Sequence, residues 1–405
     1  MDYPIVIIYY NKKYDISQDE TYFLVAFNIK IFHNVYFLCL TILRVLSNTN
    51  NKKMIIKSIL DTKLNKFQNL NNEQEELLQQ QQLFYLSDYR YGGCTTFTAH
   101  LLYLLKIKFI ICMSNAFEKD IGDFGYGIYY QKMPIAFLDN IERMFIADMY
   151  QNFHLLEKLK NKDITIVVHD ACEIFKENEY YLKHWKIIVI RKTVKDYLKS
   201  KYDINAKFVH HPFYPYKRFF KDYENDNINK CRTEDGVSIS RIEYHKNIDM
   251  ILKANKKLKK PIKIYGLTNP EYVSSKLNKL DFNKYYQGKF EKSFSNISNI
   301  LRKSKFMVDL SQLPNDGGGT QYTFLEAIYN NSAIILNRKW IENIDKKYCD
   351  FKEGYNCYAV SNEQELIELI NNSSNIDTTK IMQNAKKLMY RHINTAEEWK
   401  KVIYL

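Results

Sequence analysis

Short apolar runs that alternate with helical patterns dominate the chain from residue 83 onward. A first series of runs lies at Leu83–Leu86, Phe109–Cys112, Met144–Ala147, Ile164–Val168 and Ile187–Ile190. Runs of this length without polar alternation are typical of strands buried on both faces, and helices between them imply parallel pairing. The pattern predicts a Rossmann-like βαβ domain over residues 83–215.

A second series begins after a hinge-like segment, His210–Pro215, in which two prolines interrupt helix and sheet, and a polar stretch, Asp222–Asp235. Its apolar runs lie at Val237–Ser240, Ile262–Tyr265, Phe306–Asp309, Ala333–Leu336 and Cys357–Val360. Helical patterns lie near 246–258, 271–280 and 320–330 and at 363–371, 379–391 and 395–404. We therefore predict an α/β chain with two facing Rossmann-like domains and a cleft between them.

The domain boundaries follow from these two series. Residues 83–215 are expected to form the N-terminal domain and residues 216–394 the C-terminal domain, with a helix at 395–405 that packs back toward the N-terminal domain. Residues 1–82 form an N-terminal extension of unclear role. It holds a strand-like run at Ile5–Tyr10, helix-like patches around 21–46 and a polar stretch at Asn69–Gln82. An acceptor-binding or partner-docking appendage is one hypothesis for it.

Composition adds little about partners but more about location. The chain has 59 Lys and Arg against 46 Asp and Glu, a net charge of +13, which permits an acidic partner. The chain is also rich in Lys, Asn, Ile and Tyr, as expected of AT-rich coding, in a viral genome for example. Such coding makes proteins basic whatever they bind, so the charge is weak evidence for an acidic partner. Seven cysteines without a C-x-x-C pair favour a reducing compartment. We predict a cytoplasmic protein without a transmembrane segment, in the host cytoplasm if the source is viral, with peripheral membrane attachment as an alternative.

Two candidate motifs lie in the N-terminal half. Gly92, Gly93 and Thr95 stand between a predicted strand and a helix, where glycines let the backbone approach a ligand. The motif matches neither G-x-G-x-x-G nor a Walker P-loop, so a tight turn is an equal alternative. His169 and Asp170 follow the run Ile164–Val168, at a strand end where ligands bind in such sheets. A hydrogen-bonded turn is the alternative for this pair.

Two more motifs lie in the C-terminal half. Arg241 follows a predicted strand and Lys246 opens a helix, so a forked cation and a point charge are available for a pyrophosphate. Further on, Gly317, Gly318, Gly319 and Thr320 precede a helix that contains Glu326. Amides before a helix suit an anion, and a carboxylate can accept hydrogen bonds from a ribose diol. A flexible turn is the alternative for the glycines.

These motifs, in this order, resemble those of the GT-B glycosyltransferases, especially the retaining family-4 type. The resemblance rests on Ser240-Arg241, Lys246-Asn247, Glu326-Ala327 and the strand Ala333–Leu336. It implies that Arg241 and Lys246 hold the donor pyrophosphate and that Glu326 holds the ribose. The family's E-x7-E pair is incomplete, since Gly318 replaces the first Glu. The contact that this Glu would make to the sugar is then made by the backbone or by Asp316, or is not made at all.

The N-terminal half resembles the bacteriophage DNA α-glucosyltransferases, with a Gly turn, a Thr-containing helix start and a strand that runs into His-Asp. The resemblance implies that Gly92, Gly93 and Thr95 lie on the acceptor or sugar side and that His169 and Asp170 are catalytic. His169 would polarise the sugar and Asp170 would orient the acceptor hydroxyl.

The implied activity is transfer of a hexose from a nucleotide sugar, UDP-linked by family likeness, to a glycan, lipid-linked or protein acceptor. The resemblance further implies retention, no metal and no cofactor. Two alternatives stay open. One is glycosylation of hydroxymethylated bases in DNA, with Tyr89, Arg90 and Tyr91 as contributors. The other is a non-catalytic GT-B-like protein that binds a nucleotide or a partner.

Overall fold

The computed structural model of the chain describes thirteen stretches of residues. These are 5–7, 25–27, 82–87, 92–107, 109–113, 117–119, 121–133, 135–149, 152–216, 232–289, 291–313, 316–342 and 348–404. The predicted contributors Tyr89, Arg90 and Tyr91 lie outside them, as do residues 69–81 of the predicted linker. The chain divides into two units, Met1–Glu76 and Leu77–Leu405. In the first, β1 (Ile5–Ile7) pairs antiparallel with β2 (Val25–Phe27), so part of the patch around 21–46 is a strand rather than a helix.

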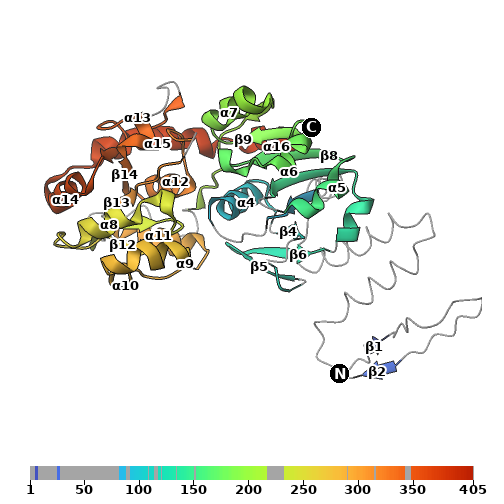
Figure 1. The fold of residues 1–405 in the computed structure, drawn as a ribbon, viewed down its shortest axis with the longest axis horizontal. Coiled ribbons are helices and arrows are strands. Elements are labelled where there is room, and N and C mark those ends of the chain that lie inside the picture. The colour runs from blue at the N-terminus through green and yellow to red at the C-terminus, as the bar shows by residue number, and fades with distance from the viewer. Residues whose placement is uncertain are drawn as a thin grey trace, which may run out of the picture. The chain divides into compact units, whose positions relative to one another are not determined.

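The second unit contains two sheets, and the first of them defines what we call the N-domain (Figure 1). Its strand order is β10-β9-β8-β7-β3-β4-β6-β5, and every pairing is parallel except that of β5 with β6. The strands are β3 (Gln82–Tyr85), β4 (Phe109–Cys112), β5 (Ile121–Gly125), β6 (Ile128–Lys132), β7 (Arg143–Asp148), β8 (Asp163–Val168), β9 (Lys186–Val189) and β10 (Ala206–Phe208). The helices are α4 (Gly93–Leu104), α5 (Leu156–Leu159), α6 (Lys176–Leu182) and α7 (Lys192–Tyr202).

The second sheet defines the C-domain and is parallel throughout, in the order β12-β11-β13-β14-β15. Its strands are β11 (Glu234–Ile239), β12 (Lys263–Tyr265), β13 (Ser304–Asp309), β14 (Ala333–Asn337) and β15 (Tyr358–Val360). The helices are α8 (Ile248–Asn255), α9 (Pro270–Tyr272), α10 (Phe282–Tyr285), α11 (Phe294–Arg302), α12 (Tyr322–Tyr329), α13 (Arg338–Glu342), α14 (Glu363–Asn371), α15 (Thr379–Ile393) and α16 (Ala396–Tyr404). Because β11 lies between β12 and β13, the chain reverses direction across the sheet there, which is where such sheets bind ligands.

Each apolar run of both predicted series forms a strand, but three strands of the N-domain were not predicted. Strand β5 contains Gly122 and Gly125, and the apolar pattern of β6 is interrupted by Tyr129, which is half exposed, and by the polar Gln131 and Lys132. Strand β5 is the edge strand and β6 lies between it and β4, and one-sided burial in this part of the sheet gives no continuous apolar run. The third, β10, has only three residues.

The helix predicted near 271–280 is divided into three short pieces. After α9 come a π-helical turn at Val273–Leu277 and a 3-10 turn at Asn278–Leu280. The hydroxyls of Ser274 and Ser275 both donate to the carbonyl of Glu271. Hydroxyls that bond back to the preceding turn compete with the regular helical pattern, which accounts for the irregularity.

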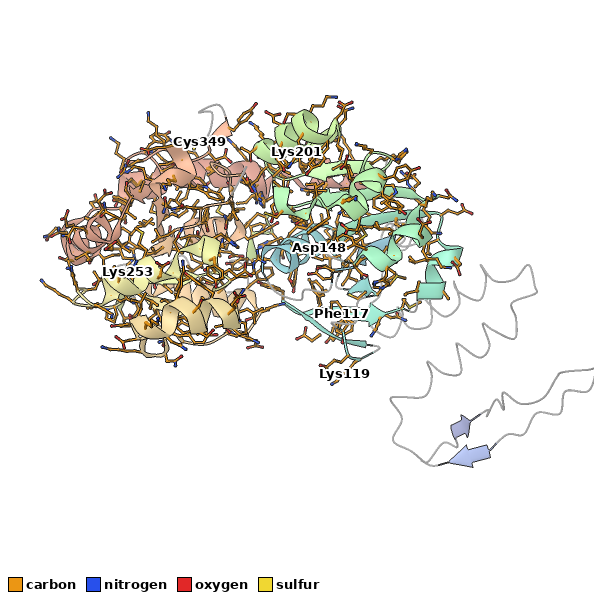
Figure 2. All side chains as sticks on the ribbon, viewed as in Figure 1. Phe117, Lys119, Asp148, Lys201, Lys253 and Cys349 are labelled. Carbon is orange, nitrogen blue, oxygen red and sulfur yellow. The ribbon has the colours of Figure 1, made fainter. Side chains whose placement is uncertain are left out.

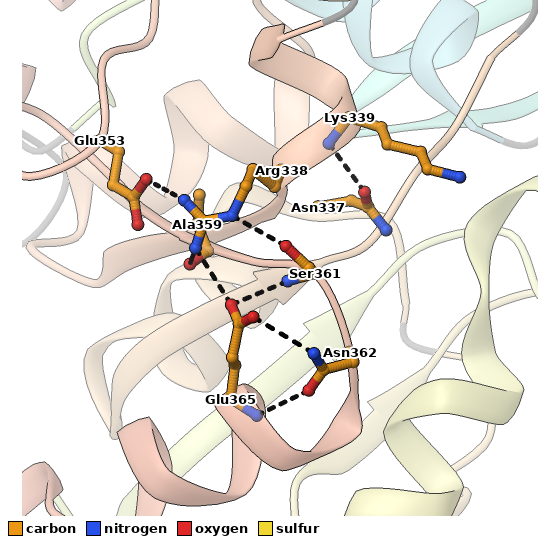
Figure 3. A network of polar contacts seen from close by, with 8 residues as sticks. All are labelled: Asn337, Arg338, Lys339, Glu353, Ala359, Ser361, Asn362 and Glu365. Carbon is orange, nitrogen blue, oxygen red and sulfur yellow. Dashed lines mark hydrogen bonds and ion pairs between the residues drawn. The ribbon is translucent and has the colours of Figure 1, made fainter.

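Arg338 connects the last strands of the C-domain to α14 (Figure 3). Its Nε donates to Ser361 Oγ at 2.8 Å, one Nη donates to Glu353, and the other donates to Glu365 Oε2 at 3.0 Å and to the carbonyl of Ala359. The two carboxylates and their hydrogen bonds raise the pKa of Arg338, with the bond to Glu365 as the largest cause. These hydrogen bonds of Arg338 fix the outer edge of the sheet.

The two domains are packed together by the C-terminal helix as well as by the chain that crosses between them. In α16, the buried ring of Trp399 lies edge-on to Phe97 of α4 at 5.3 Å, and its Nε1 donates to the carbonyl of His210 at 2.9 Å. Helix α16 therefore contacts the N-domain. Among the described residues, every helix is too short or too polar to cross a membrane.

Candidate active site

A cavity of about 430 Å³ lies between the N-domain and the C-domain. The N-domain contributes side chains that stand at or just after strand ends, namely Asp148 (β7), His169 (β8) and Arg191 (β9). From the C-domain, Arg241 follows β11 in the same way. In Figure 2, Asp148 lies on the N-domain close to its junction with the C-domain. The cavity thus lies at the carboxyl ends of the strands of both sheets, the usual ligand position in this architecture.

The structure brings most of the predicted site residues together around this cavity. Those that line it are Gly92, Gly93, His169, Asp170, Arg241, Lys246 and Glu326. Those that lie elsewhere among the described residues are Thr95, Gly317, Gly318, Gly319 and Thr320. The hydroxyl of Thr95 is buried against Tyr85 at 3.4 Å, and the neighbouring Cys94 and Thr96 line the cavity instead.

Gly92 and Arg241 contact each other across the cleft. Gly92 precedes α4 with a φ of 93°, which a residue with a side chain rarely adopts. A Cβ added there would lie 3.6 Å from Cδ of Arg241, so the arginine stem packs along the glycine backbone. The guanidinium is partly exposed, and its Nη1 lies 3.4 Å from Oε1 of Glu243. The tight turn of the N-domain thus leaves room for a C-domain cation.

Lys246 is a buried cation on the C-domain side of the cavity. Its Nζ donates to Ser311 Oγ at 2.7 Å and to Gln321 Oε1 at 3.1 Å, and it lies 3.7 Å from Oδ2 of Asp309. Burial lowers the pKa of Lys246, an effect that Asp309 opposes and the nearby charge of Arg241 strengthens. An anion in the cavity would stabilise the protonated form.

His169 and its neighbours give the N-domain side a different character. The Nε2 of His169 lies 2.8 Å from the carbonyl of Ala147, which can only accept, so this nitrogen carries the proton. Burial lowers the pKa of His169, although Asp148 opposes the shift. Asp170 accepts from the amide of Cys172 at 2.8 Å and begins a short helical turn.

Glu173 adds a carboxylate to this side. It accepts from the amide of His169 at 2.7 Å. Burial raises its pKa well above the usual range, and the charges of Asp170 and Asp148 raise it further. The N-domain side of the cavity therefore carries the carboxyl groups of Asp148, Asp170 and Glu173 beside Arg191, and the C-domain side carries the cations Arg241 and Lys246 beside Glu243.

The glycine loop before α12 is bonded within the protein. The amides of Gly317, Gly318 and Gly319 donate to Asp316 Oδ1, the carbonyl of Trp340 and the carbonyl of Gly317, respectively. Thr320 is buried, and its hydroxyl lies 3.4 Å from Asp350. The residues that face the cavity here are the next three, Gln321, Tyr322 and Thr323, at the first turn of α12. Amides of a first helical turn have no partner inside the helix, so they suit an anion better than the glycines do.

Asp316 is committed to a contact across the domains. Its Oδ1 accepts from Nε of Arg191 at 3.0 Å and from the hydroxyl of Thr193 at 2.9 Å, and its Oδ2 forms an ion pair with an Nη of the same guanidinium. A Cβ on Gly319 would lie 3.0 Å from Cδ of Arg191, so the glycine makes room for the arginine. In the sequence, Asp316 was one candidate to replace the missing first Glu of the E-x7-E pair as a contact to the sugar. In the structure, its carboxylate is bonded to protein groups instead.

Glu326 lies beneath the cavity floor. It borders the cavity, but its side chain has no exposed surface, and its carboxylate accepts from His100 Nε2 at 2.9 Å and from the hydroxyl of Tyr216. Both oxygens therefore have partners from outside α12.

Several cavity residues were not predicted from the sequence: Cys94, Asp148, Glu173, Arg191 and His211. A signal existed for Asp148 and Arg191, because each is a charged residue at or just after the end of a buried apolar run, the position that identified His169. His211 was read as part of the hinge. It is buried, and burial lowers its pKa well below the usual range.

One trio of cavity residues has donor atoms suited to a metal. The ligand atoms of Cys94, Asp148 and His169 all lie within 4.8 Å of one another. A thiol, a carboxylate and an imidazole form a set that zinc accepts. A metal-independent site therefore remains a prediction to be tested.

Comparison with known proteins identifies solved structures that share the fold. No known family model and no curated protein matches the sequence. Among solved structures, HepE of Anabaena in complex with UDP and glucose has a TM-score of 0.58 and 13% identity, over 80% of this chain and 98% of that chain. An alpha-glucosyltransferase in complex with UDP and a 13-mer DNA containing an HMU base has a TM-score of 0.59 and 14% identity, over 80% and 99%.

A glycosyltransferase from Rickettsia africae has a TM-score of 0.53 and 16% identity, over 80% of this chain and 99% of that chain. The three matches each span nearly the whole of the other protein and agree with the two parallel sheets described above. The chain therefore has the two-domain GT-B fold of these glycosyltransferases.

Proposed function

We propose that the chain transfers a hexose from a UDP-linked donor to a hydroxyl acceptor in the cavity between its two domains. The observation that carries the proposal is the cluster of Arg241, Lys246 and the first turn of α12 on one wall of this cavity. Two cations and a helix N-terminus form an anion site of the kind that a nucleoside diphosphate requires. The UDP-bound structural neighbours support the same donor class.

The chemistry that this wall supplies is stabilisation of the leaving diphosphate. Negative charge grows on the diphosphate as its bond to the sugar breaks, and groups fixed in advance stabilise that charge without having to reorganise. Lys246 is held by Ser311 and Gln321 before any ligand arrives. Arg241 is the more exposed cation, and its planar guanidinium can donate two parallel hydrogen bonds to phosphate oxygens.

The opposite wall would receive the sugar and the acceptor. His169 is held by Ala147 through Nε2, which leaves Nδ1 as the nitrogen able to accept from a sugar hydroxyl. Asp170 is partly exposed at the cavity and would orient the acceptor hydroxyl. In a retaining, front-face reaction the departing phosphate oxygen takes the acceptor proton, so no dedicated nucleophile or metal is required.

Binding of UDP and UDP-glucose to the full chain, measured by calorimetry, tests the proposal. Arg241→Ala should weaken UDP at least tenfold, because it removes a charged diphosphate ligand. Arg391→Ala is the matched control, since Arg391 is 63% exposed and outside the cavity lining. Absence of UDP and UDP-glucose binding to the wild-type chain would contradict the proposal and favour a non-catalytic role.

The acceptor is proposed to be a glycan, a lipid-linked sugar or a protein. Glycosylation of a hydroxymethylated base in DNA is a second candidate, favoured by the net charge of +13 and by the neighbour that holds DNA. Duplex DNA binding measured from 50 to 200 mM salt separates the two. A fall in affinity of about a thousandfold indicates DNA as the acceptor, and salt-independent transfer to an oligosaccharide indicates a glycan.

A further inference from the structure

A thiol, a carboxylate and an imidazole lie together on the N-domain wall of the cavity. Cys94 is the second residue of α4, Asp148 ends β7 and His169 directly follows β8. Their ligand atoms all lie within 4.8 Å of one another, and all three residues line the cavity. Three segments that are distant in the sequence thus bring three different metal-binding groups to one place.

The spacing of these groups suits a zinc ion. Bonds of about 2.3 Å to sulfur and about 2.0–2.2 Å to nitrogen or oxygen place the ligand atoms of a tetrahedral zinc site roughly 3.3–3.6 Å apart. Atoms that lie up to 4.8 Å apart would have to approach one another by at most roughly 1.5 Å. Rotation of the Cys94 side chain, which is partly exposed at the cavity, supplies a movement of this size.

His169 is held in the orientation that a metal ligand requires. It is 5% exposed, its ring lies edge-on to Phe97 at 4.7 Å, and its Nε2 donates to the carbonyl of Ala147 at 2.8 Å. Nδ1 then carries a lone pair and has no hydrogen-bond partner among the residues that the structure describes. Metal-binding histidines donate their second nitrogen to a carbonyl or a carboxylate in this way. A metal in the cavity would give the buried Nδ1 a partner.

The charges on this wall also favour a divalent cation. Asp148 is 1% exposed, Glu173 lines the same wall, and the guanidinium of Arg191 is paired with Asp316. Sulfur and imidazole ligands select zinc over magnesium and calcium, which prefer oxygen. On binding, the thiol of Cys94 loses its proton to solvent, so a thiolate and a carboxylate balance the charge of Zn²⁺. The fourth position of the metal is left to water or to a ligand in the cavity.

We propose that Cys94, Asp148 and His169 form an inhibitory zinc site. Under the proposed function, Nδ1 of His169 accepts from a hydroxyl of the donor's sugar, so a zinc ion on this nitrogen takes the place of the sugar. Arg241 and Lys246, which would hold the diphosphate, belong to the other wall and are not ligands of the metal. Zinc should therefore exclude UDP-glucose and leave room for UDP. The mode of inhibition rests on the proposed function, whereas the metal site does not.

The first experiment measures metal binding to the full chain without any nucleotide. Co²⁺ takes the same ligands as zinc and gives a thiolate charge-transfer absorption band when a cysteine binds it. The wild-type chain should show this band and lose it when zinc is added. Cys94→Ser should abolish the band, and Asp148→Asn should weaken zinc binding at least tenfold, because each change removes a ligand.

Cys172→Ser is the matched control for this experiment. Cys172 lines the same cavity but does not belong to the group of three ligands, so its loss should change neither the band nor the zinc affinity. Absence of the band in the wild-type chain, or a band that persists unchanged in Cys94→Ser, would overturn the site. Thermal unfolding shows that each variant has folded, and should Asp148→Asn not fold, the comparison of Cys94→Ser with Cys172→Ser decides.

The second experiment tests the inhibitory role by calorimetry of UDP and UDP-glucose, with and without zinc at a concentration that fills the site. Zinc should weaken UDP-glucose at least tenfold and change the affinity for UDP by no more than about twofold, because only the sugar requires His169. The same titrations of Cys94→Ser correct for complexes of zinc with the diphosphate in solution. After this correction, equal weakening of both ligands, or of neither, would overturn the inhibitory role. If the wild-type chain binds neither UDP nor UDP-glucose, the proposed function fails, while the cobalt spectrum still decides whether the site binds a metal.

Discussion

The ion pair of Arg191 and Asp316 gives a direct test of how strongly the two domains are joined. Arg191 precedes α7 in the N-domain and Asp316 precedes the glycine loop of the C-domain, and their side chains are only 8% and 1% exposed. A hydrogen bond from Nε and an ion contact from an Nη form the pair, and Thr193 adds a second hydrogen-bond donor to the carboxylate. We consider Arg191→Met, Asp316→Asn and the double variant.

The magnitude follows from burial. Removing one partner of a buried ion pair leaves an uncompensated charge and costs about 3–5 kcal/mol, whereas replacing both partners costs much less. For a unit the size of Leu77–Leu405, the entropy of unfolding is about 0.7 kcal/mol per kelvin. Each single variant should therefore lower the unfolding midpoint by about 4–7 °C. The double variant should fall short of the sum of the single losses by about 2 kcal/mol or more.

Differential scanning calorimetry measures these shifts. Lys199→Met is the matched control, because the pair of Lys199 and Asp203 is 54% and 84% exposed and such pairs contribute little. Unfolding midpoints of both single variants within 1 °C of the wild type would refute the reasoning. Such a result would mean that removing one partner does not leave a buried, unpaired charge behind. A second transition in the single variants alone would show that the pair couples the unfolding of the domains.

Three further predictions concern backbone, pH and metal. Gly92→Ala should lower stability by about 1–2 kcal/mol because of its positive φ, whereas Gly93→Ala, exposed and with open space around its Cβ position, should be neutral or slightly stabilising in the same urea titration. Burial, with the nearby charges of His210 and Arg391, lowers the pKa of His392 to about 3. The unfolded chain then binds more protons below pH 6.5, so this histidine should lower the stability by about 2.3 kcal/mol between pH 6.5 and 4.5, and His392→Gln should lose less in urea titrations across that range. Donor turnover should be unchanged by a chelator if no metal is required, and any inhibition by added zinc should be weaker in Cys94→Ser.

The sequence predicts the buried strands well because their signal is local. Ile164–Val168 and Phe306–Asp309 are continuous apolar runs, and each is a strand of a parallel sheet in the structure. Arg241 could be identified for the same reason, since it directly follows such a run, and Lys246 was identified by its place at the start of the next predicted helix. The edge strand β5 and its neighbour β6 could not, because one-sided burial leaves polar and glycine residues in the pattern.

Contacts between distant segments carry no local signal. Arg191 and Asp316 are 125 positions apart, and His100 and Glu326 are 226 apart, so neither pair could be predicted from spacing. The glycine loop shows the complementary limit. Its composition permits an anion site, but the amides of Gly317 and Gly318 are bonded to Asp316 and Trp340 once the chain has folded. A motif identifies which groups are available, and packing decides which of them stay available.

The two cross-domain links have different consequences for opening of the cleft between the domains. The pair of Arg191 and Asp316 joins a guanidinium to a carboxylate, so opening the cleft there would expose two polar groups that water solvates well, at a cost set mainly by their mutual attraction. The link between His100 and Glu326 joins an imidazole to a carboxylate among aromatic rings, so separation would also expose apolar surface. Cleft opening should therefore be easier at the Arg191 side than at the His100 side. Hydrogen exchange in the amides of α4 and of the Gly317–Gly319 loop would reveal this order, because the loop should exchange first. Equal protection of the two segments would contradict it.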